Sequence, residues 1–203
     1  MGYEKTYLKG INMKYEMMIP PFKHGEFIDM RKKEVQQYFD WYISQVNYRI
    51  NVLNEQIEKE GLEIVLDYSA DSLIPLWEWY EKKIEFVRKD AEEYKNEIDK
   101  HPVWMQSEIL TTKVSFETLK YALDISMYFA EIIIRNSKGK VKWGYFTSPK
   151  KRMSVNEPTL LGFKSDMDLN PRLIVLNCTR RSSKERLNTR LFEMYNTWMS
   201  YIE

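Results

Sequence analysis

Hydrophobic positions recur at steps of three and four residues in four stretches of the chain, which is the spacing of one buried helical face. The longest stretch begins near Met30 and stops at Gly61, a residue type that commonly ends a helix. The sequence therefore predicts a long helix here with a broad apolar face. Its apolar stripe consists of Val35, Phe39, Ile43, Val46, Ile50, Leu53 and Ile57, with Tyr38, Trp41 and Tyr42 beside it.

The same period predicts three more helices. One starts near Ser72 and ends before His101-Pro102. Another covers about residues 115–136, and the last opens at Ser182, because Ser182 and Glu185 have the spacing of a capping box. The inward positions of the first of these are Leu73, Leu76, Trp77, Tyr80, Ile84 and Val87; those of the last are Leu187, Leu191, Met194, Trp198 and Ile202.

Short runs with alternating or β-branched apolar residues predict strands. The candidates are residues 62–68, 141–145, 159–163 and 173–178, the last of which has the continuous apolar character of a buried strand. Residues 131–135 leave two alternatives open, because this β-branched run could continue the third helix or begin a strand that turns through Gly139.

Residues 1–24 show no period and contain Pro20-Pro21, which predicts an irregular N-terminal arm. No repeat or linker divides the remainder, so residues 25–203 are predicted to form a single α+β domain. The expected architecture has long amphipathic helices packed on a small, largely antiparallel sheet that is formed mainly by the C-terminal half.

Composition narrows the class of protein. The 203 residues are 43% hydrophobic and include 7 Gly and 7 Pro, which excludes disordered and collagen-like chains. Cys178 is the single cysteine, so neither an intramolecular disulfide nor a cysteine-based zinc site can form within one chain. The start lacks the apolar core of a signal peptide, and no run approaches the length of a membrane span. We therefore expect a cytoplasmic protein that does not enter a membrane.

Charge is unevenly distributed, although the formal net charge is only +1. Residues 54–108 contain 15 acidic and 7 basic side chains, whereas residues 138–190 contain 13 basic and 4 acidic ones. Such segregation affects the choice of partner and the rate of encounter rather than the fold.

Two segments carry a resemblance. Residues 66–73, which read LDYSADSL and continue to Leu76-Trp77-Glu78-Trp79, are similar to an LD-(Y/F)-(S/T)-x-x-SL-x-x-L signature. Tyr128-Phe129-Ala130-Glu131, followed by Trp143, resembles a Y-x-G-E helix ending in which Ala130 replaces the preferred glycine. Together they resemble small uncharacterised bacterial α+β proteins, some of them immunity proteins of toxin systems. The resemblance implies a bacterial α+β domain and transfers no activity.

Candidate chemistry is sparse. The chain has no P-loop, dinucleotide-binding, nucleophile-elbow or zinc-protease motif, so we assign no catalytic residue, metal ligand or cofactor and favour a protein that is not an enzyme. Glu131 is the strongest candidate among the carboxylates for a general base or ligand in an enzyme, but an ion pair or hydrogen bond is the commoner role of such a residue. Asp166 and Asp168 could bind a divalent cation, but two acidic residues with this spacing are more often part of a turn.

A basic cluster near the C-terminus supports an alternative function. Its residues could contact nucleic-acid phosphates or another anion, with Lys150, Lys151 and Arg152 adding to them from an earlier loop. A solvated surface is the competing interpretation, since the whole chain is nearly neutral. The cluster consists of Arg180, Arg181, Lys184, Arg186 and Arg190.

The leading hypothesis is a protein-binding module, with neutralisation of a protein toxin as its specific form. The acidic region would meet a basic partner and speed the encounter by electrostatic steering. The sequence leaves the oligomeric state open. The residues predicted to contact the partner are Glu78, Glu81, Glu85, Asp90, Glu92 and Glu93.

Overall fold

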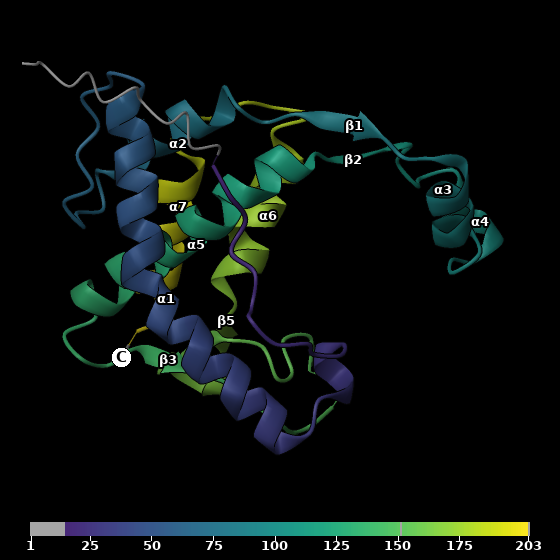
Figure 1. The fold of residues 1–203 in the computed structure, drawn as a ribbon, viewed down its shortest axis with the longest axis horizontal. Helices are drawn as coiled ribbons and strands as arrows, with labels where there is room; N and C mark the ends of the chain where they lie inside the picture. The colour runs from purple at the N-terminus through teal and green to yellow at the C-terminus, as the bar shows by residue number, and fades with distance from the viewer. Residues whose placement is uncertain (1–14, 151, 203) are drawn as a thin grey trace, which may run out of the picture.

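The computed structural model describes residues 15–150 and 152–202, which form an α+β fold in which helices predominate. Figure 1 shows α1, α5, α6 and α7 gathered into one body, with a small sheet at one end. Two further helices are carried away from this body on a narrow β-ribbon. The α-helices are α1 (Lys32–Lys59), α2 (Leu73–Glu81), α3 (Ala91–Ile98), α4 (Val103–Gln106), α5 (Phe116–Asn136), α6 (Pro171–Arg181) and α7 (Arg190–Met199).

The α1 helix confirms the first predicted helix, and its buried face differs slightly from the predicted stripe. Five of the seven stripe positions are buried, while Phe39 and Ile43 are only half-buried. Tyr38 and Tyr42 are buried in addition, and the Trp143 ring meets the Tyr42 ring edge-on with 5.7 Å between centroids. The ring of Phe27, in the 3-10 helix η1 (Phe27–Asp29), meets the Tyr38 ring edge-on with 5.0 Å between centroids.

The α5 helix packs against both α1 and α6 and forms the centre of the core. The side chain of Ser115 accepts a hydrogen bond from the backbone N–H of Thr118 and so caps its first turn. The β-branched run at residues 131–135 continues this helix instead of starting a strand, because Ile132 and Ile133 are both fully buried. The turn that follows has Gly139 at a φ of 83°, a conformation that glycine adopts without a steric penalty.

Both sheets are small and antiparallel. The three-stranded sheet has the order β3-β4-β5 and comes from the C-terminal half, as predicted, while a separate ribbon pairs β1 with β2. The strands are β1 (Phe86–Arg88), β2 (Thr112–Val114), β3 (Lys142–Gly144), β4 (Thr159–Leu161) and β5 (Asp168–Leu169), with the 3-10 helix η2 (Lys164–Asp166) between the last two.

Three sequence predictions of secondary structure are wrong. Residues 62–68 form no strand, since no neighbouring strand pairs with them. The predicted helix from Ser72 to residue 100 is two helices, α2 and α3, interrupted by β1. Residues 173–178 belong to helix α6, in which Asn170 is the N-cap and Pro171 the first residue.

The predicted start of the last helix is also wrong. Ser182 ends α6 as its C-cap, and α7 begins only at Arg190. Of the predicted N-terminal arm, residues 15–24 contain no helix or strand, and residues 1–14 lie outside the described part. None of the described helices combines the length and apolar character that a membrane crossing requires.

Candidate interaction surface

The β1–β2 ribbon and the helices between its strands form a projecting element, which we call the extension (residues 86–114). Phe86 pairs with Val114 and Arg88 with Thr112 in an antiparallel register. The base is fixed to the body by two hydrogen bonds: the Ser115 N–H donates to the Glu85 carbonyl (2.9 Å), and the Glu85 N–H donates to the Thr118 hydroxyl (2.9 Å). The ribbon therefore has a defined origin on α5.

Helix α3 is held in place by contacts within the extension. Asp90 and Glu93 form a reciprocal capping box at its start. Lys89 donates to Glu97 at 2.6 Å and to the Leu110 carbonyl at 2.7 Å, and Lys113 pairs with Glu93. For the part of the chain that the structure describes, the hydrogen bonds of residues 89–111 end inside the extension. The extension is thus a folded unit whose hydrogen bonds, apart from those at its base, do not depend on the body.

Apolar side chains are exposed at the far end of the extension. Helices α3 and α4 bury no residue. On α4 the side chains of Val103 and Trp104 are 83% and 78% exposed, and Leu110 in the following loop is 58% exposed. A large apolar patch on a monomer commonly marks a contact site, and tryptophan is the residue type most enriched at the energetic centre of interfaces.

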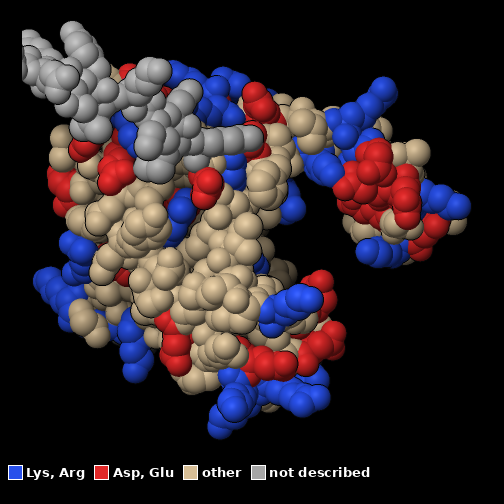
Figure 2. Space-filling view, in the orientation of Figure 1, with Lys and Arg blue, Asp and Glu red and all other residues tan. Residues whose placement is uncertain are grey.

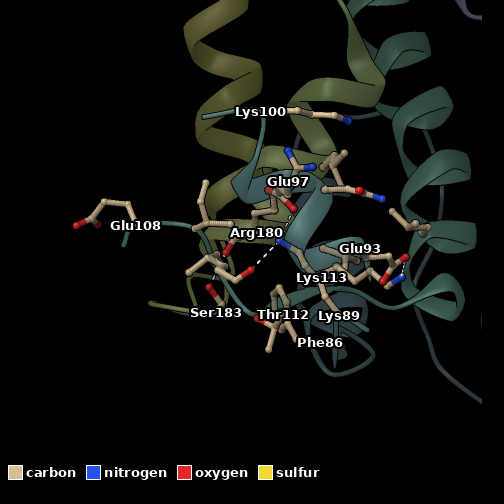
Figure 3. A pocket seen from close by; sticks show the side chains of 16 residues that line it. Phe86, Lys89, Glu93, Glu97, Lys100, Glu108, Thr112, Lys113, Arg180 and Ser183 are labelled. Carbon is tan, nitrogen blue, oxygen red and sulfur yellow. Dashed lines mark hydrogen bonds and ion pairs between the residues drawn. The ribbon is translucent and has the colours of Figure 1, made fainter. Parts of the chain in front are cut away.

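An open cleft of ≈ 830 Å³ separates the extension from the body (Figures 2 and 3). Phe86, Leu119 and Leu176 give it an apolar surface, and Arg180 and Ser183 of the α6 end lie on the side of the body. Figure 3 shows the Lys89–Glu97 and Lys113–Glu93 pairs on the side of the extension. Neither Val103 nor Trp104 lines this cleft.

Five of the six acidic residues predicted to bind a partner are exposed. Asp90, Glu92 and Glu93 lie at the start of α3, and Figure 2 shows acidic side chains gathered over this end of the extension. Glu78 is exposed on α2 and pairs with Lys82 at 2.9 Å. Glu85 is exposed at the base of the ribbon. The structure thus spreads these five residues from α2 to α3.

The sixth acidic residue, Glu81, is wrongly predicted. Its side chain is buried and accepts hydrogen bonds from the Ser182 hydroxyl at 2.8 Å and the Leu187 N–H at 3.2 Å. It therefore ties α2 to the connection between α6 and α7. The sequence predicts that the Ser182 side chain caps a helix, whereas in the structure its hydroxyl donates a hydrogen bond to Glu81.

The predicted basic cluster is only partly available to a ligand. Arg180, Arg181, Lys184 and Arg186 are exposed. Arg190 is buried, donates to the Glu185 carbonyl at 2.8 Å and has the Glu185 carboxylate 3.6 Å away. Arg180 and Arg181 lie in the last turn of α6, where the helix dipole stabilises positive charge, so these two residues need no bound anion.

The earlier basic loop does not join this cluster. Arg152 pairs with Asp168 at 3.6 Å and lies over the Phe146 ring at 3.8 Å. Asp168 precedes the first turn of α6, while Arg180 lies in its last turn, and 11 helical residues span about 16 Å. Lys151 lies outside the described residues. The basic side chains therefore form two separate groups.

The contacts of Glu131 are those of a residue that stabilises the fold. Its carboxylate accepts a hydrogen bond from the Trp143 indole N–H at 2.9 Å and has Arg135 3.9 Å away. The neighbouring Tyr128 hydroxyl is engaged elsewhere, by Ser72 at 2.7 Å. Among the described residues, no three His, Cys, Asp or Glu side chains come together as a metal site requires. Cys178 is buried in α6, and burial raises the pKa of its thiol to about 11.

No family model, curated protein or solved structure matches this chain. The resemblance to immunity proteins thus stays a prediction, and the surface has to be interpreted from its own residues.

One buried polar cluster was missed by the sequence analysis. Asp124 of α5 is fully buried and accepts hydrogen bonds from Arg49 Nε at 2.9 Å and Nη2 at 2.6 Å. The Tyr15 hydroxyl donates to the same carboxylate, and Lys120 donates to the Tyr15 carbonyl at 2.7 Å. Burial raises the pKa of Asp124, and its hydrogen bonds with Arg49 and Tyr15 oppose this rise. With both oxygens occupied, the cluster joins α1, α5 and the N-terminal segment.

Proposed function

We propose that this chain is a protein-binding module and that its partner contacts the extension. The observation that carries the proposal is that α3 and α4 bury no side chain while Val103 and Trp104 are largely exposed. Ordering a segment of this length costs conformational entropy, and burial within the body returns almost none of it. A binding role explains why such an element is present.

The charge of α3 supports a basic partner. Residues 90–99 contain five carboxylates and one lysine, and they lie beside the apolar residues of α4. A partner surface with an apolar pocket and a basic rim would match both features, since apolar anchors supply affinity and opposite charge speeds encounter. Neutralisation of a basic protein toxin is the specific form of this proposal.

The test immobilises four proteins and exposes each to a lysate of the source cells. They are the wild type, an α4 variant that combines Val103→Ala and Trp104→Ala, a charge variant that combines Glu92→Lys and Asp99→Lys, and Met153→Ala. Met153 is 86% exposed on the body, so its variant is the matched control. We expect one protein to be retained by wild type and control and lost by the α4 variant. With that protein purified, truncation of Trp104 should raise the Kd at least about 30-fold.

The Glu92→Lys, Asp99→Lys variant should weaken binding mainly at low salt, where steering is strongest. Where the retained protein is toxic to cells, co-expression of wild type should restore growth and co-expression of the α4 variant should not. Equal retention by all four proteins, or no retained protein at all, would refute the proposal.

A further inference from the structure

The chain that follows α1 runs alongside that helix without a neighbouring strand. We call residues 62–67 the unpaired segment. It begins after Gly61, which has a φ of 71°, and ends before Tyr68, which has a φ of 62°. Between these two residues the chain makes neither a turn nor a bend. Figure 1 shows this stretch beside α1, on the side away from the extension.

The side chains of the unpaired segment alternate between the core and the solvent. Ile64 and Leu66 are half-buried and pack against the core. The residues between and beside them are exposed, and Val65 is 70% exposed. A period of two is that of a strand with one face on the core and the other in water. The exposed residues are Glu63, Val65 and Asp67.

The backbone groups of the unpaired segment are not used by the fold. In the described part of the chain, no hydrogen bond reaches an N–H or C=O group of residues 63–66. These four consecutive residues therefore present donors and acceptors with the spacing that a second extended backbone requires.

A cleft runs along the unpaired segment. It has a volume of ≈ 370 Å³ and separates the segment from α1. Ile50, Ile64 and Leu66 give it an apolar surface, and Asn51 and Glu58 of α1 add polar groups. The cleft offers space for the side chains that an added strand directs toward the core.

The surroundings of the unpaired segment are acidic. Residues 55–67 contain five acidic side chains and one basic one. Glu60 is paired with Lys83 at 2.8 Å. The other four are exposed, and none of them forms an ion pair with a described residue. This charge favours a basic partner. The four exposed acidic residues are Glu55, Glu58, Glu63 and Asp67.

We propose that the unpaired segment binds an extended, basic segment of a partner protein by β-strand addition. Backbone hydrogen bonds to residues 63–66 hold the added strand, and its alternate side chains give specificity. Apolar side chains lie beside Ile64 and Leu66 on the core side, and lysine or arginine lies beside Glu63 and Asp67 on the solvent side. This surface is separate from the extension, so the inference goes beyond the proposed function.

A short peptide of alternating residues tests the proposal. The probe is acetyl-Lys-Val-Thr-Val-Lys-amide, whose valines match Ile64 and Leu66 and whose lysines match Glu63 and Asp67. Titrated into the isotope-labelled full chain and followed by NMR, it should shift the amide signals of residues 63–67 with a Kd of about 1 mM or lower. Cross-strand contacts between Hα atoms should appear in the complex. Unchanged amide signals at about 10 mM peptide would overturn the proposal.

Two N-methylated peptides give the sharper test, because an added strand turns the N–H groups of alternate residues toward its neighbour. One peptide is methylated at both valine nitrogens, and the other at the nitrogens of the threonine and the last lysine. We expect one of them to bind like the unmodified probe and the other to bind at least about tenfold more weakly, since it loses two hydrogen bonds. Weakening of both peptides, or of neither, would rule out strand addition.

A charge change on the unpaired segment tests the basic character of the partner. Glu63→Lys should raise the Kd of the probe at least about fivefold, because it places lysine beside lysine. Glu92→Lys makes the same change on α3 and is the matched control, since Glu92 is exposed and lies outside this surface. A Kd that ignores Glu63→Lys, or that rises equally in Glu92→Lys, contradicts the proposal.

The outcome is distinguishable from that of the proposed function. The α4 variant, Val103→Ala with Trp104→Ala, should bind the probe like the wild type. Loss of the probe from this variant would place the peptide on the extension and overturn only strand addition. A chain that binds the probe as expected but retains no Trp104-dependent protein would overturn only the proposed function.

Discussion

The Asp124→Asn variant is expected to lose about 3 to 5 kcal/mol of its free energy of unfolding, because it leaves Arg49 charged and buried without a counterion. The Asp124 side chain is fully buried, and the Arg49 side chain is 6% exposed. The two form a two-pronged contact, with Nε at 2.9 Å and Nη2 at 2.6 Å from the carboxylate oxygens. Urea-induced unfolding, followed by circular dichroism, measures the loss.

Two controls separate this effect from a general sensitivity to charge. Glu78→Gln removes an exposed ion pair with Lys82 and should cost no more than about 0.5 kcal/mol. The double variant Arg49→Met, Asp124→Leu removes both charges and should be more stable than Asp124→Asn, because no unpaired charge stays buried. An Asp124→Asn variant as stable as Glu78→Gln would show that the Arg49–Asp124 pair does not contribute this free energy of unfolding.

The Glu81→Ala variant should lose about 1.5 to 3 kcal/mol of its free energy of unfolding. Two donors, the Ser182 hydroxyl and the Leu187 N–H, lose their acceptor within the protein, and the carboxylate that they serve is charged. The loss comes from the joint between α2 and the α6–α7 connection, so thermal and urea unfolding should both report it.

Glu85→Ala is the matched control, because Glu85 is exposed on the same stretch of chain, and surface substitutions usually change stability by about 0.5 kcal/mol or less. Partner binding by the folded Glu81→Ala protein should be unchanged. If Glu81→Ala were as stable as Glu85→Ala but defective in binding, Glu81 would belong to the contact surface after all.

Long periodic helices could be predicted from the sequence. In α1 and α5 the apolar residues repeat over many turns, and Ser115 marks the start of α5 with a capping side chain. Their pairing through Arg49 and Asp124 could not be predicted, because the two residues lie 75 positions apart and a single sequence does not say which charges meet. Only the presence of charged residues within the apolar faces, Arg49 in α1 and Lys120 and Asp124 in α5, gave a signal.

Short elements were harder to predict. Residues 173–178 are apolar without a clear period, so helix and strand could not be separated by pattern. The signals that decide it are Asn170 as a cap and Pro171 at the first helical position. Residues 62–68 have strand-like composition, but a strand also needs a neighbour, and the fold provides none.

The extension was missed because its strands contain only three residues each. The one clear signal is the spacing of Asp90 and Glu93, which form a capping box and mark a new helix start inside the predicted one. The sequence shows that this region is acidic, but the placement of its residues on a projecting element depends on the β1–β2 pairing. The pairing of β1 with β2 thus decides which surface this acidic stretch occupies.

The most direct measurement is the unfolding free energy of a variant in which Asn-Gly replaces residues 90–110. The Lys89 N–H donates to the Thr111 carbonyl at 2.9 Å, and Asn-Gly is a preferred two-residue link between the members of such a hydrogen-bonded pair. If the extension serves binding rather than folding, the shortened chain should unfold cooperatively within about 1 kcal/mol of wild type and should lose all Trp104-dependent association. A shortened chain that fails to fold, or that is less stable by several kcal/mol, would show that the extension is part of the folding unit.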